Sequence, residues 1–244
     1  MASFLTITDT GDVRTITMSN PGRMNAVPPE GWGELADAFE ALDASDARVL
    51  VLTGADGEFC AGADMSRRAD VPSAADNVSR MASTVNRAAV ALHRTSKPTI
   101  AAVDGVAVGA GMNLAIGCDI VIATGRARFA EVFVKRGLTL DFGGTWLLPR
   151  LVGLAHAREI ALTGRIVDAV EALAIGLVCE VVEQDALGRR VEDVAGELAA
   201  GAPLAQAMIK KALDRPSSMT FEQALAFEAH AQGILLGSED LAEG

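Results

Sequence analysis

Short apolar segments with the length of β-strands alternate with longer helical segments along most of the chain, which limits the folds open to it. The run RVLVLTG at 48–54 is apolar and ends in glycine, which is typical of a buried strand. Before it, Trp32, Leu35 and Phe39 recur at helical spacing. The alternation persists as far as LVCEVV at 177–182. The pattern predicts an α/β fold, in which the elements can form a coiled ββα superhelix as readily as a flat sheet.

The two ends of the chain depart from this alternation. Residues 3–18 alternate weakly between apolar and polar around the turn sequence TGD, which predicts a β-hairpin. From residue 184 onward the apolar positions recur only at helical spacing. The 244 residues could form two domains by length, but α/β chains of this size often form one core. We therefore expect one core over 1–183 and a helical region over 184–244.

The charge of the chain excludes several classes of partner. A formal net charge of −11 argues against nucleic acid, because binding to a phosphate backbone needs clustered Lys and Arg. No run of eighteen apolar residues occurs, and the first twenty residues lack the apolar block of a signal peptide. We expect a cytoplasmic protein that binds neither nucleic acid nor membrane. Any anionic ligand must be held by local groups.

The cysteines and histidines do not form a metal-binding pattern. Cys60, Cys118 and Cys179 are far apart, and each lies among apolar or small residues, as reduced and buried thiols do. The three histidines show no close spacing with one another or with a cysteine. We expect neither disulfides nor a metal site.

Two segments concentrate small residues where predicted strands end: FCAGADM at 59–65 and VAVGAGMNLAIGCD at 106–119. Glycine and alanine leave the peptide N–H groups unobstructed, and the second segment runs into a helix whose first amides are unpaired. Such a pair of amides can stabilise negative charge on a carbonyl oxygen. The same composition also suits turns in which a helix packs closely against a strand. Both interpretations stand at this point.

Two nucleotide-binding motifs are excluded. Gly109 and Gly111 are followed by Leu114 where the third glycine of a dinucleotide-binding GxGxxG motif belongs. No GxxxxGK[ST] sequence occurs, so a phosphate-binding P-loop is absent.

The segments FCAGADM, SKPTIAAVDGVAVGAGMNLAIGCDI and GLTLDFGGTWLLPRLVG, in this order, resemble the crotonase (enoyl-CoA hydratase/isomerase) family. NPGRMNAV upstream and LTGRIVDAVEALAIGLVCEVV downstream are similar to it too. The resemblance covers about residues 3–240. It implies a spiral core of ββα turns, a C-terminal helical region that forms a homotrimer or a dimer of trimers, and a coenzyme A thioester as substrate with no further cofactor. Family members commonly continue past SEDLAEG with another helical turn that helps close the CoA pocket.

The resemblance also assigns residues by their place in the motifs. It implies that the amides of Ala63 and Ala110 hold the thioester oxygen. Where the family often has glycine at the second position, alanine serves equally, because the donor is a backbone N–H. Asp64 is expected to order its loop rather than to act as an acid. The substrate-binding residues implied are Ala61, Gly62, Asp64, Met65, Gly109, Phe133 and Leu138.

The acid–base residues depart from the hydratase pattern. The two positions that hold glutamates in hydratases of the family hold Asn113 and Phe133 here, and neither residue can act as a general base. A carboxylate occurs instead at Asp141, which resembles in position the carboxylate of the family's isomerases and the nucleophile of its dehalogenases. On turn statistics alone, an aspartate before Gly143-Gly144 also suits a surface turn. Glu131 is expected in a structural ion pair with Arg126, Arg128 or Lys135.

These features predict an isomerase in which Asp141 moves a proton on an unsaturated acyl-CoA. A non-catalytic acyl-CoA-binding protein and a hydratase with relocated acid–base groups are the alternatives. A dehalogenase is less favoured, because the sequence offers no placement for the histidine base that it needs. The acyl group itself is left open.

Overall fold

The computed structural model describes residues 3–67, 73–214 and 219–238. Six strands form the main sheet in the order β1-β2-β3-β4-β6-β9. Three more form a small sheet in the order β5-β7-β8. The strands are β1 (Leu5–Thr10), β2 (Val13–Met18), β3 (Val49–Gly54), β4 (Thr99–Val103), β5 (Val106–Val108), β6 (Ile120–Thr124), β7 (Arg128–Ala130), β8 (Ile166–Asp168) and β9 (Glu180–Val182).

The register of the main sheet follows the sequence pattern. β1 and β2 form the predicted hairpin, with Thr10 opposite Val13, and each later pair from β2 to β9 is parallel. The predicted strand at 177–182 is shorter in the structure, because only Glu180–Val182 pair with β6, while Leu177 and Val178 are buried in the core.

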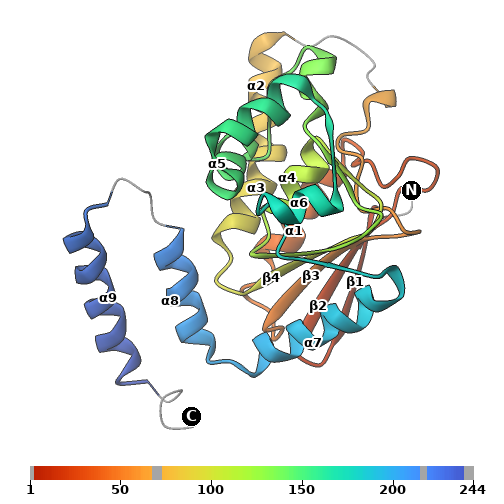
Figure 1. Cartoon of the computed structure of the whole chain (residues 1–244). Coiled ribbons are helices and arrows are strands. Elements are labelled where there is room, and N and C mark those ends of the chain that lie inside the picture. Colours follow the sequence, from red (N-terminus) through yellow and green to blue (C-terminus); the bar gives the residue numbers. More distant parts are fainter. Residues whose placement is uncertain (1–2, 68–72, 215–218, 239–244) are drawn as a thin grey trace.

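The helices cover both faces of the main sheet (Figure 1). They are α1 (Gly31–Glu40), α2 (Ala74–Ser83), α3 (Val85–Arg94), α4 (Ala110–Ile116), α5 (Gly144–Thr163), α6 (Ala169–Ala174), α7 (Leu187–Ala200), α8 (Pro203–Leu213) and α9 (Phe221–Leu235), with short 3-10 turns η1 (Met65–Arg67), η2 (Val132–Arg136) and η3 (Gln184–Ala186). α5 is kinked at Gly153, whose φ of 75° and ψ of 159° are not helical.

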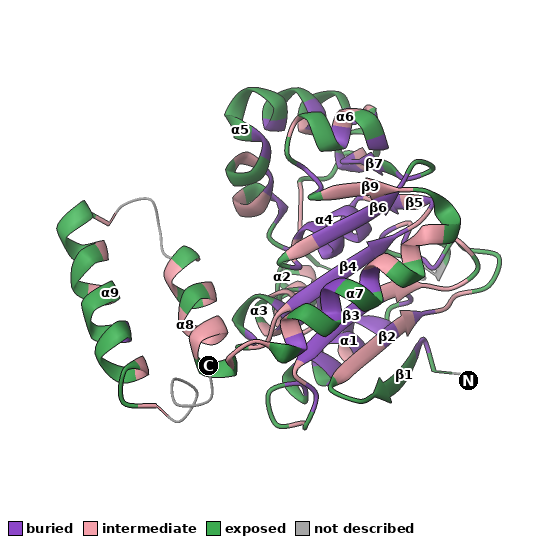
Figure 2. Ribbon diagram, turned by 60° about the horizontal axis from the view of Figure 1, so that its bottom comes forward, coloured by how far each residue is buried: buried purple, intermediate pink, exposed green. Residues whose placement is uncertain are grey.

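Alternate residues of the parallel strands pack against different helices, as their continuous apolar runs predict. Leu50 and Leu52 of β3 join the larger core with α1, α3 and α4. Val49 and Val51 face the other way and pack with Val191 and other apolar residues of α7. α7 therefore begins the helical region in sequence but completes the sheet core in space (Figure 2).

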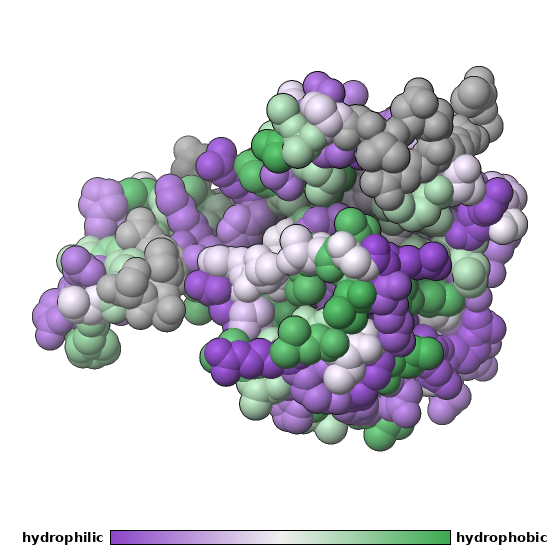
Figure 3. Space-filling model, turned by 90° about the horizontal axis from the view of Figure 1, so that it is seen from above, coloured by the Kyte–Doolittle hydropathy of each residue, from purple (hydrophilic) through white to green (hydrophobic). Residues whose placement is uncertain are grey.

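α8 and α9 project from one side of the molecule (Figures 1 and 3). α8 is attached to the core by Lys210, whose Nζ donates to Asp119 at 2.8 Å and to the main-chain carbonyl of Lys97 at 3.1 Å. Large apolar side chains of α9 are exposed, among them Phe221 and Leu225. No helix in the described residues combines the length and the apolar character needed to cross a membrane.

Candidate functional site

The two small-residue segments predicted to hold a ligand lie side by side. Cys60 pairs with Ala107 in a parallel bridge: the Cys60 N–H donates to Val106 at 2.8 Å, and the Val108 N–H donates to Cys60 at 3.0 Å. A Cβ built on Gly111 would lie 2.2 Å from the Cys60 carbonyl oxygen. Close packing therefore explains why the start of α4 is made of small residues, so one of the two interpretations of these glycines is confirmed for Gly111.

The Ala63 N–H takes no part in the hydrogen bonds that join its loop to Val27. Val27 bridges to Ala63, and in this parallel arrangement its hydrogen bonds go to the two neighbours of Ala63: the Val27 N–H donates to Gly62 at 2.7 Å, and the Asp64 N–H donates to Val27 at 2.8 Å. The Ala63 N–H points away from this pairing. Among the described residues it has no hydrogen-bond acceptor, and Ala63 is exposed.

The Ala110 N–H also has no acceptor in the part of the chain that the structure describes, but for a different reason. Ala110 is the first residue of α4, where an N–H has no partner within the helix. The preceding residue, Gly109, has φ 58° and ψ −127°, a conformation that favours glycine, and it has no side chain to cap the helix. A Cβ on Gly62 would lie 3.5 Å from the Ala110 nitrogen. The residue before Ala63 is thus in contact with the second predicted donor.

The other residues predicted around Ala63 have the following positions. Asp64 orders the loop as expected, because its Oδ1 accepts from the Ser66 N–H at 2.9 Å and from the Ser66 hydroxyl at 2.7 Å. Ala61 is half-buried, its N–H donating to Met24 at 2.9 Å. The Met65 side chain is exposed.

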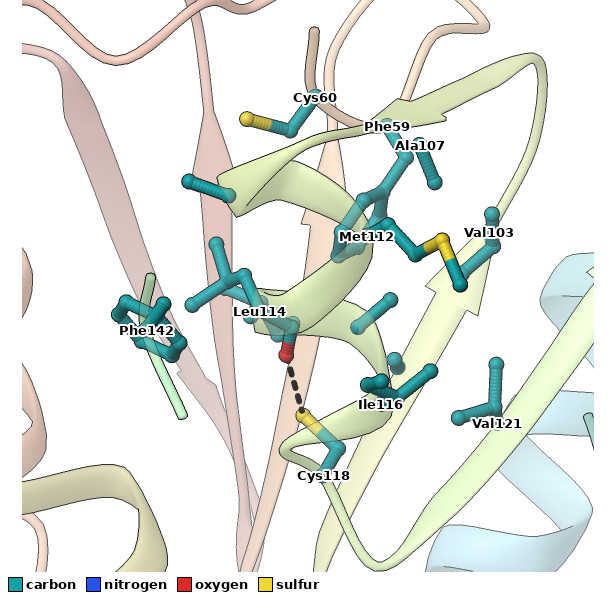
Figure 4. Close-up of a cluster of buried hydrophobic side chains, with 14 of the residues drawn as sticks. Phe59, Cys60, Val103, Ala107, Met112, Leu114, Ile116, Cys118, Val121 and Phe142 are labelled. Atoms are coloured by element: carbon teal, nitrogen blue, oxygen red, sulfur yellow. Dashed lines mark hydrogen bonds between the residues drawn. The ribbon is translucent and has the colours of Figure 1, made fainter. Parts of the chain in front are cut away.

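α4 connects the amide of Ala110 to the loop of Asp141. Asn113 lies three residues after Ala110, about 4.5 Å along the helix axis. Its Nδ2 donates to the Asp141 main-chain carbonyl at 3.0 Å, and the Gly144 N–H donates to the same oxygen at 2.9 Å. The rest of α4 is fixed in the core: Met112, Leu114 and Ile116 lie among apolar side chains, and Phe142 reaches the same cluster from the loop before α5 (Figure 4).

The Asp141 carboxyl is partly withdrawn from solvent. Its Oδ1 is buried and has no hydrogen-bond partner. Burial raises the pKa of Asp141 to about 6. A surface-turn aspartate would be solvated at both oxygens, so the structure does not favour that interpretation. A carboxylate with a pKa near neutral is a better proton acceptor than an ordinary aspartate and still ionises at neutral pH.

Glu131 corrects the sequence analysis. The predicted ion pair with Arg126, Arg128 or Lys135 is wrong, because Glu131 is fully buried and neither carboxyl oxygen has a partner. Arg126 instead pairs with Asp104, and Arg128 donates to main-chain carbonyls. Burial is the main cause that raises the pKa of Glu131 to about 8, and the negative charge of Asp141 adds to it. The nearby Asn113 amide lowers the pKa in part, without meeting full hydrogen-bond geometry.

The two larger apolar residues expected around the substrate, Phe133 and Leu138, differ in their exposure. Phe133 is buried, and its ring lies 3.6 Å from a Cβ built on Gly109, while Leu138 is 47% exposed. Trp146 has other neighbours: the His93 ring makes an edge-to-face contact with it, with the ring centres 5.2 Å apart, and the Arg150 guanidinium lies 3.9 Å from its ring centre. A cavity of about 450 Å³ on that side is lined by residues of α5, of α8 and of the segment from the end of α4 into β6, and none of Ala63, Ala110 or Asp141 lines it.

The thiols are mostly where the sequence predicted them. Cys60 and Cys118 are buried, and burial raises the pKa of each thiol to about 12, so neither acts as a nucleophile. Cys179 is exposed, contrary to the prediction, because after the buried pair Leu177 and Val178 it leads into β9, which is the edge strand of the main sheet.

The sequence of the whole chain agrees with this arrangement of loops. Residues 8–244 match the family model described as enoyl-CoA hydratase/isomerase. The chain belongs to this family. The resemblance drawn from its motifs is therefore confirmed.

Relatives within the family carry different reaction names. The chain is 37% identical over 238 residues to a 1,2-epoxyphenylacetyl-CoA isomerase of Escherichia coli, covering 95% of this chain and 90% of that protein. It is 36% identical over 233 residues to a short-chain-enoyl-CoA hydratase of Clostridium acetobutylicum, covering 94% and 88%. The family membership thus makes this chain an acyl-CoA enzyme of the hydratase/isomerase group.

Solved structures of the family confirm the predicted fold class. An enoyl-CoA hydratase from Bacillus anthracis matches with a TM-score of 0.93 at 29% identity, over 99% of this chain and 94% of that one. A Thermobifida fusca protein in complex with CoA matches with a TM-score of 0.90 at 33% identity, over 99% and 95%. The core is the ββα spiral of the crotonase family, followed by a helical C-terminal region.

Proposed function

We propose that this protein isomerises an unsaturated acyl-CoA, with Asp141 as the group that moves the proton. The observation that carries the proposal is the Asp141 carboxyl itself, which is half-buried, lacks a partner at Oδ1 and has its pKa raised to about 6. The E. coli relative named as an isomerase supports it.

The reaction divides into two proton transfers. The Asp141 carboxylate accepts a proton from the α or γ carbon of the acyl group, and the electron pair of the broken C–H bond moves into the thioester as an enolate. The free amides of Ala63 and Ala110 hold the enolate oxygen. The carboxylic acid then returns its proton to the other carbon, which leaves the double bond shifted and Asp141 ionised again. No water or redox partner is consumed.

Hydration is less well supported by these residues. It requires groups that position and deprotonate water, and the family's two glutamate positions hold Asn113 and the buried Phe133. The Asn113 amide is engaged with the loop of Asp141. The relatives named as hydratases keep an atypical hydratase as the second candidate.

The coenzyme A thioester is proposed as the substrate, with no other cofactor. The complex of the Thermobifida fusca protein with CoA supports this choice. We also propose a homotrimer or a dimer of trimers, because exposed apolar side chains on α9 need a covering surface.

Asp141→Asn tests the proposal. It removes the base and keeps the size of the side chain, so turnover of a 3-enoyl-CoA should fall about 100- to 10,000-fold, while binding of the CoA ester persists. Steady-state kinetics and calorimetric titration with the same ester measure the two effects. Asp193→Asn, on the exposed side of α7, is the control and should leave both unchanged.

Full turnover by Asp141→Asn would show that another group moves the proton. If the wild-type protein bound CoA esters but turned over none of a panel of 3-enoyl, dienoyl and ring-epoxide esters, a non-catalytic acyl-CoA-binding protein would be the better description.

A further inference from the structure

The buried polar atoms without partners gather in one place. In the described part of the chain, the buried side-chain oxygens or nitrogens that lack a hydrogen bond are Asn113 Oδ1, both carboxyl oxygens of Glu131, and Asp141 Oδ1. Buried polar groups are otherwise paired in folded proteins, and exceptions concentrate where a site binds or reacts. Three residues from α4, from the segment before η2 and from the loop before α5 thus form one cluster.

No cation compensates the two carboxyl groups of this cluster. The salt bridges among the described residues include neither Glu131 nor Asp141. α4 has no ionisable side chain. The charged or titratable groups on the other neighbouring elements are Arg128 on β7, Lys135 and Arg136 on η2, Arg150, His156, Arg158 and Glu159 on α5, Asp168 on β8 and Glu171 on α6. None of these groups contributes to the shifted pKa of Glu131, and the charge that does is that of Asp141.

Two carboxyl groups in a site without a counter-charge do not ionise together at neutral pH, since each charge opposes the other and both are poorly solvated. Asp141 is half-buried and Glu131 is fully buried, so the exposed edge of the site favours the charge on Asp141. We propose that Glu131 is a positioning residue that acts as an uncharged acid: it keeps its proton so that the single negative charge of the site resides on Asp141. The inference rests on the proposed function for its catalytic consequence.

The order in which the two carboxyl groups ionise explains why their raised pKa values have different causes. The charge of Asp141 contributes to the raised pKa of Glu131, whereas burial alone raises the pKa of Asp141. Asp141 ionises first, beside a neutral Glu131, and Glu131 then loses its proton in the field of an existing charge. Above the pKa of Glu131 the site holds two negative charges. When Asp141 takes the substrate proton, its charge passes to the thioester enolate, which then forms beside an ionised Glu131 rather than beside a neutral acid. We expect isomerisation to slow there, because the enolate is formed against repulsion.

A titration of the free protein tests the inference without turnover. Carbon-13 NMR of labelled glutamate side chains, with Glu131→Gln to identify the signal, should show Glu131 neutral at neutral pH and titrating near 8. In Asp141→Asn the same signal should titrate at a lower pH, because one cause of the shift is gone. Ionised Glu131 at neutral pH, or a titration unaffected by Asp141→Asn, would overturn the proposal.

The pH dependence of turnover on a 3-enoyl-CoA gives the second readout. The wild-type kcat should rise through a pKa near 6 and fall through a pKa near 8. Glu131→Gln keeps the size of the side chain but cannot ionise, so its pH profile should keep the acid limb and lose the alkaline limb. Glu192→Gln, on the exposed side of α7, is the matched control and should show the wild-type profile.

An alkaline limb that survives in Glu131→Gln would overturn the role of Glu131. If Asp141→Asn retained turnover, the proposed isomerisation by Asp141 would fail, and the NMR titration would still decide the charge of Glu131. The two failures are therefore distinguishable.

Discussion

At the scale of single residues, the site depends on backbone groups as much as on side chains. Among the described residues, the N–H groups of Ala63 and Ala110 lack partners because of their backbone positions. Ala63 is the residue that bridges to Val27, whose hydrogen bonds go to the neighbours of Ala63, and Ala110 is the first residue of α4. Side-chain identity matters little for such donors, which is why alanine can occupy a place that is often glycine in the family. The test of a backbone donor is therefore a substitution that removes the N–H.

Ala110→Pro removes this N–H at the position where proline suits a helix best. A proline at the first helical residue costs little stability, because that N–H has no partner in the helix. The kcat for a 3-enoyl-CoA should fall about 100- to 1,000-fold, the effect of losing one oxyanion donor. Kinetics and thermal unfolding measure the two properties. Ala110→Gly keeps the amide and should stay active, and equal activity of both variants would exclude Ala110 as a donor.

Glu131 also links the stability of the protein to pH. A carboxyl whose pKa rises from 4.5 to about 8 on folding binds its proton more tightly in the folded state. Its stabilising effect is complete below about 4.5 and is lost as the pH rises through about 8. The full shift corresponds to about 5 kcal/mol.

The expected result is that Glu131→Gln gains stability relative to the wild type as the pH increases over this window, with no further gain above it. Urea unfolding at a series of pH values gives the free energy of unfolding of each protein. A difference between them that is constant with pH would mean that Glu131 does not hold a buried proton.

At the scale of elements, α4 joins the part of the site that holds the backbone amides to the loop that carries Asp141. It begins with the Ala110 amide, fits against Cys60 through Gly111 and carries Asn113, which holds the loop of Asp141. A short helix can fix these three contacts because its remaining residues are buried on all sides (Figure 4). A change in how α4 packs against Cys60 should therefore disturb both stability and catalysis.

Gly111→Ala makes that change with one methyl group. The added Cβ would lie 2.2 Å from the Cys60 carbonyl oxygen, so the loop or the helix must shift. We expect a loss of about 1 to 3 kcal/mol in the free energy of unfolding, measured by urea denaturation. Gly196→Ala in α7 is the matched control: its Cβ meets no atom within 4 Å, and it should stabilise the helix by about 0.5 to 1 kcal/mol. The same sign for both variants would contradict the close contact.

At the scale of the whole molecule, α9 stands apart from the core, and α8 lies between the two (Figure 2). Phe221 and Leu225 lie one turn apart on α9 and are 73% and 46% exposed. Apolar side chains of this size gathered on one helix are typical of a surface covered by another chain.

Phe221→Glu combined with Leu225→Glu should therefore reduce the molecular mass in solution, because each substitution places a charge in the proposed contact between copies. Sedimentation equilibrium measures the mass. Ala75→Glu, which adds a charge on the exposed α2, should leave the assembly intact. A wild-type protein that is monomeric at all concentrations would exclude the proposed trimer.

The sequence alone determined the elements and the family. Apolar periodicity predicted the hairpin, the buried strand at 48–54 and the helical end of the chain, because spacing reflects which face of an element is buried. The spaced motifs placed Ala63, Ala110 and Asp141 by resemblance, and they predicted the loop-ordering role of Asp64.

Only the tertiary structure decided which charged residues are solvated. Glu131 has cationic neighbours in sequence, so a local pattern favours an ion pair, but α4 and the loop before α5 fold over it and leave its carboxyl buried without a partner. The physical reason is that the burial of a side chain and the electrostatic field on it come from residues far apart in the chain, and local sequence spacing does not predict these.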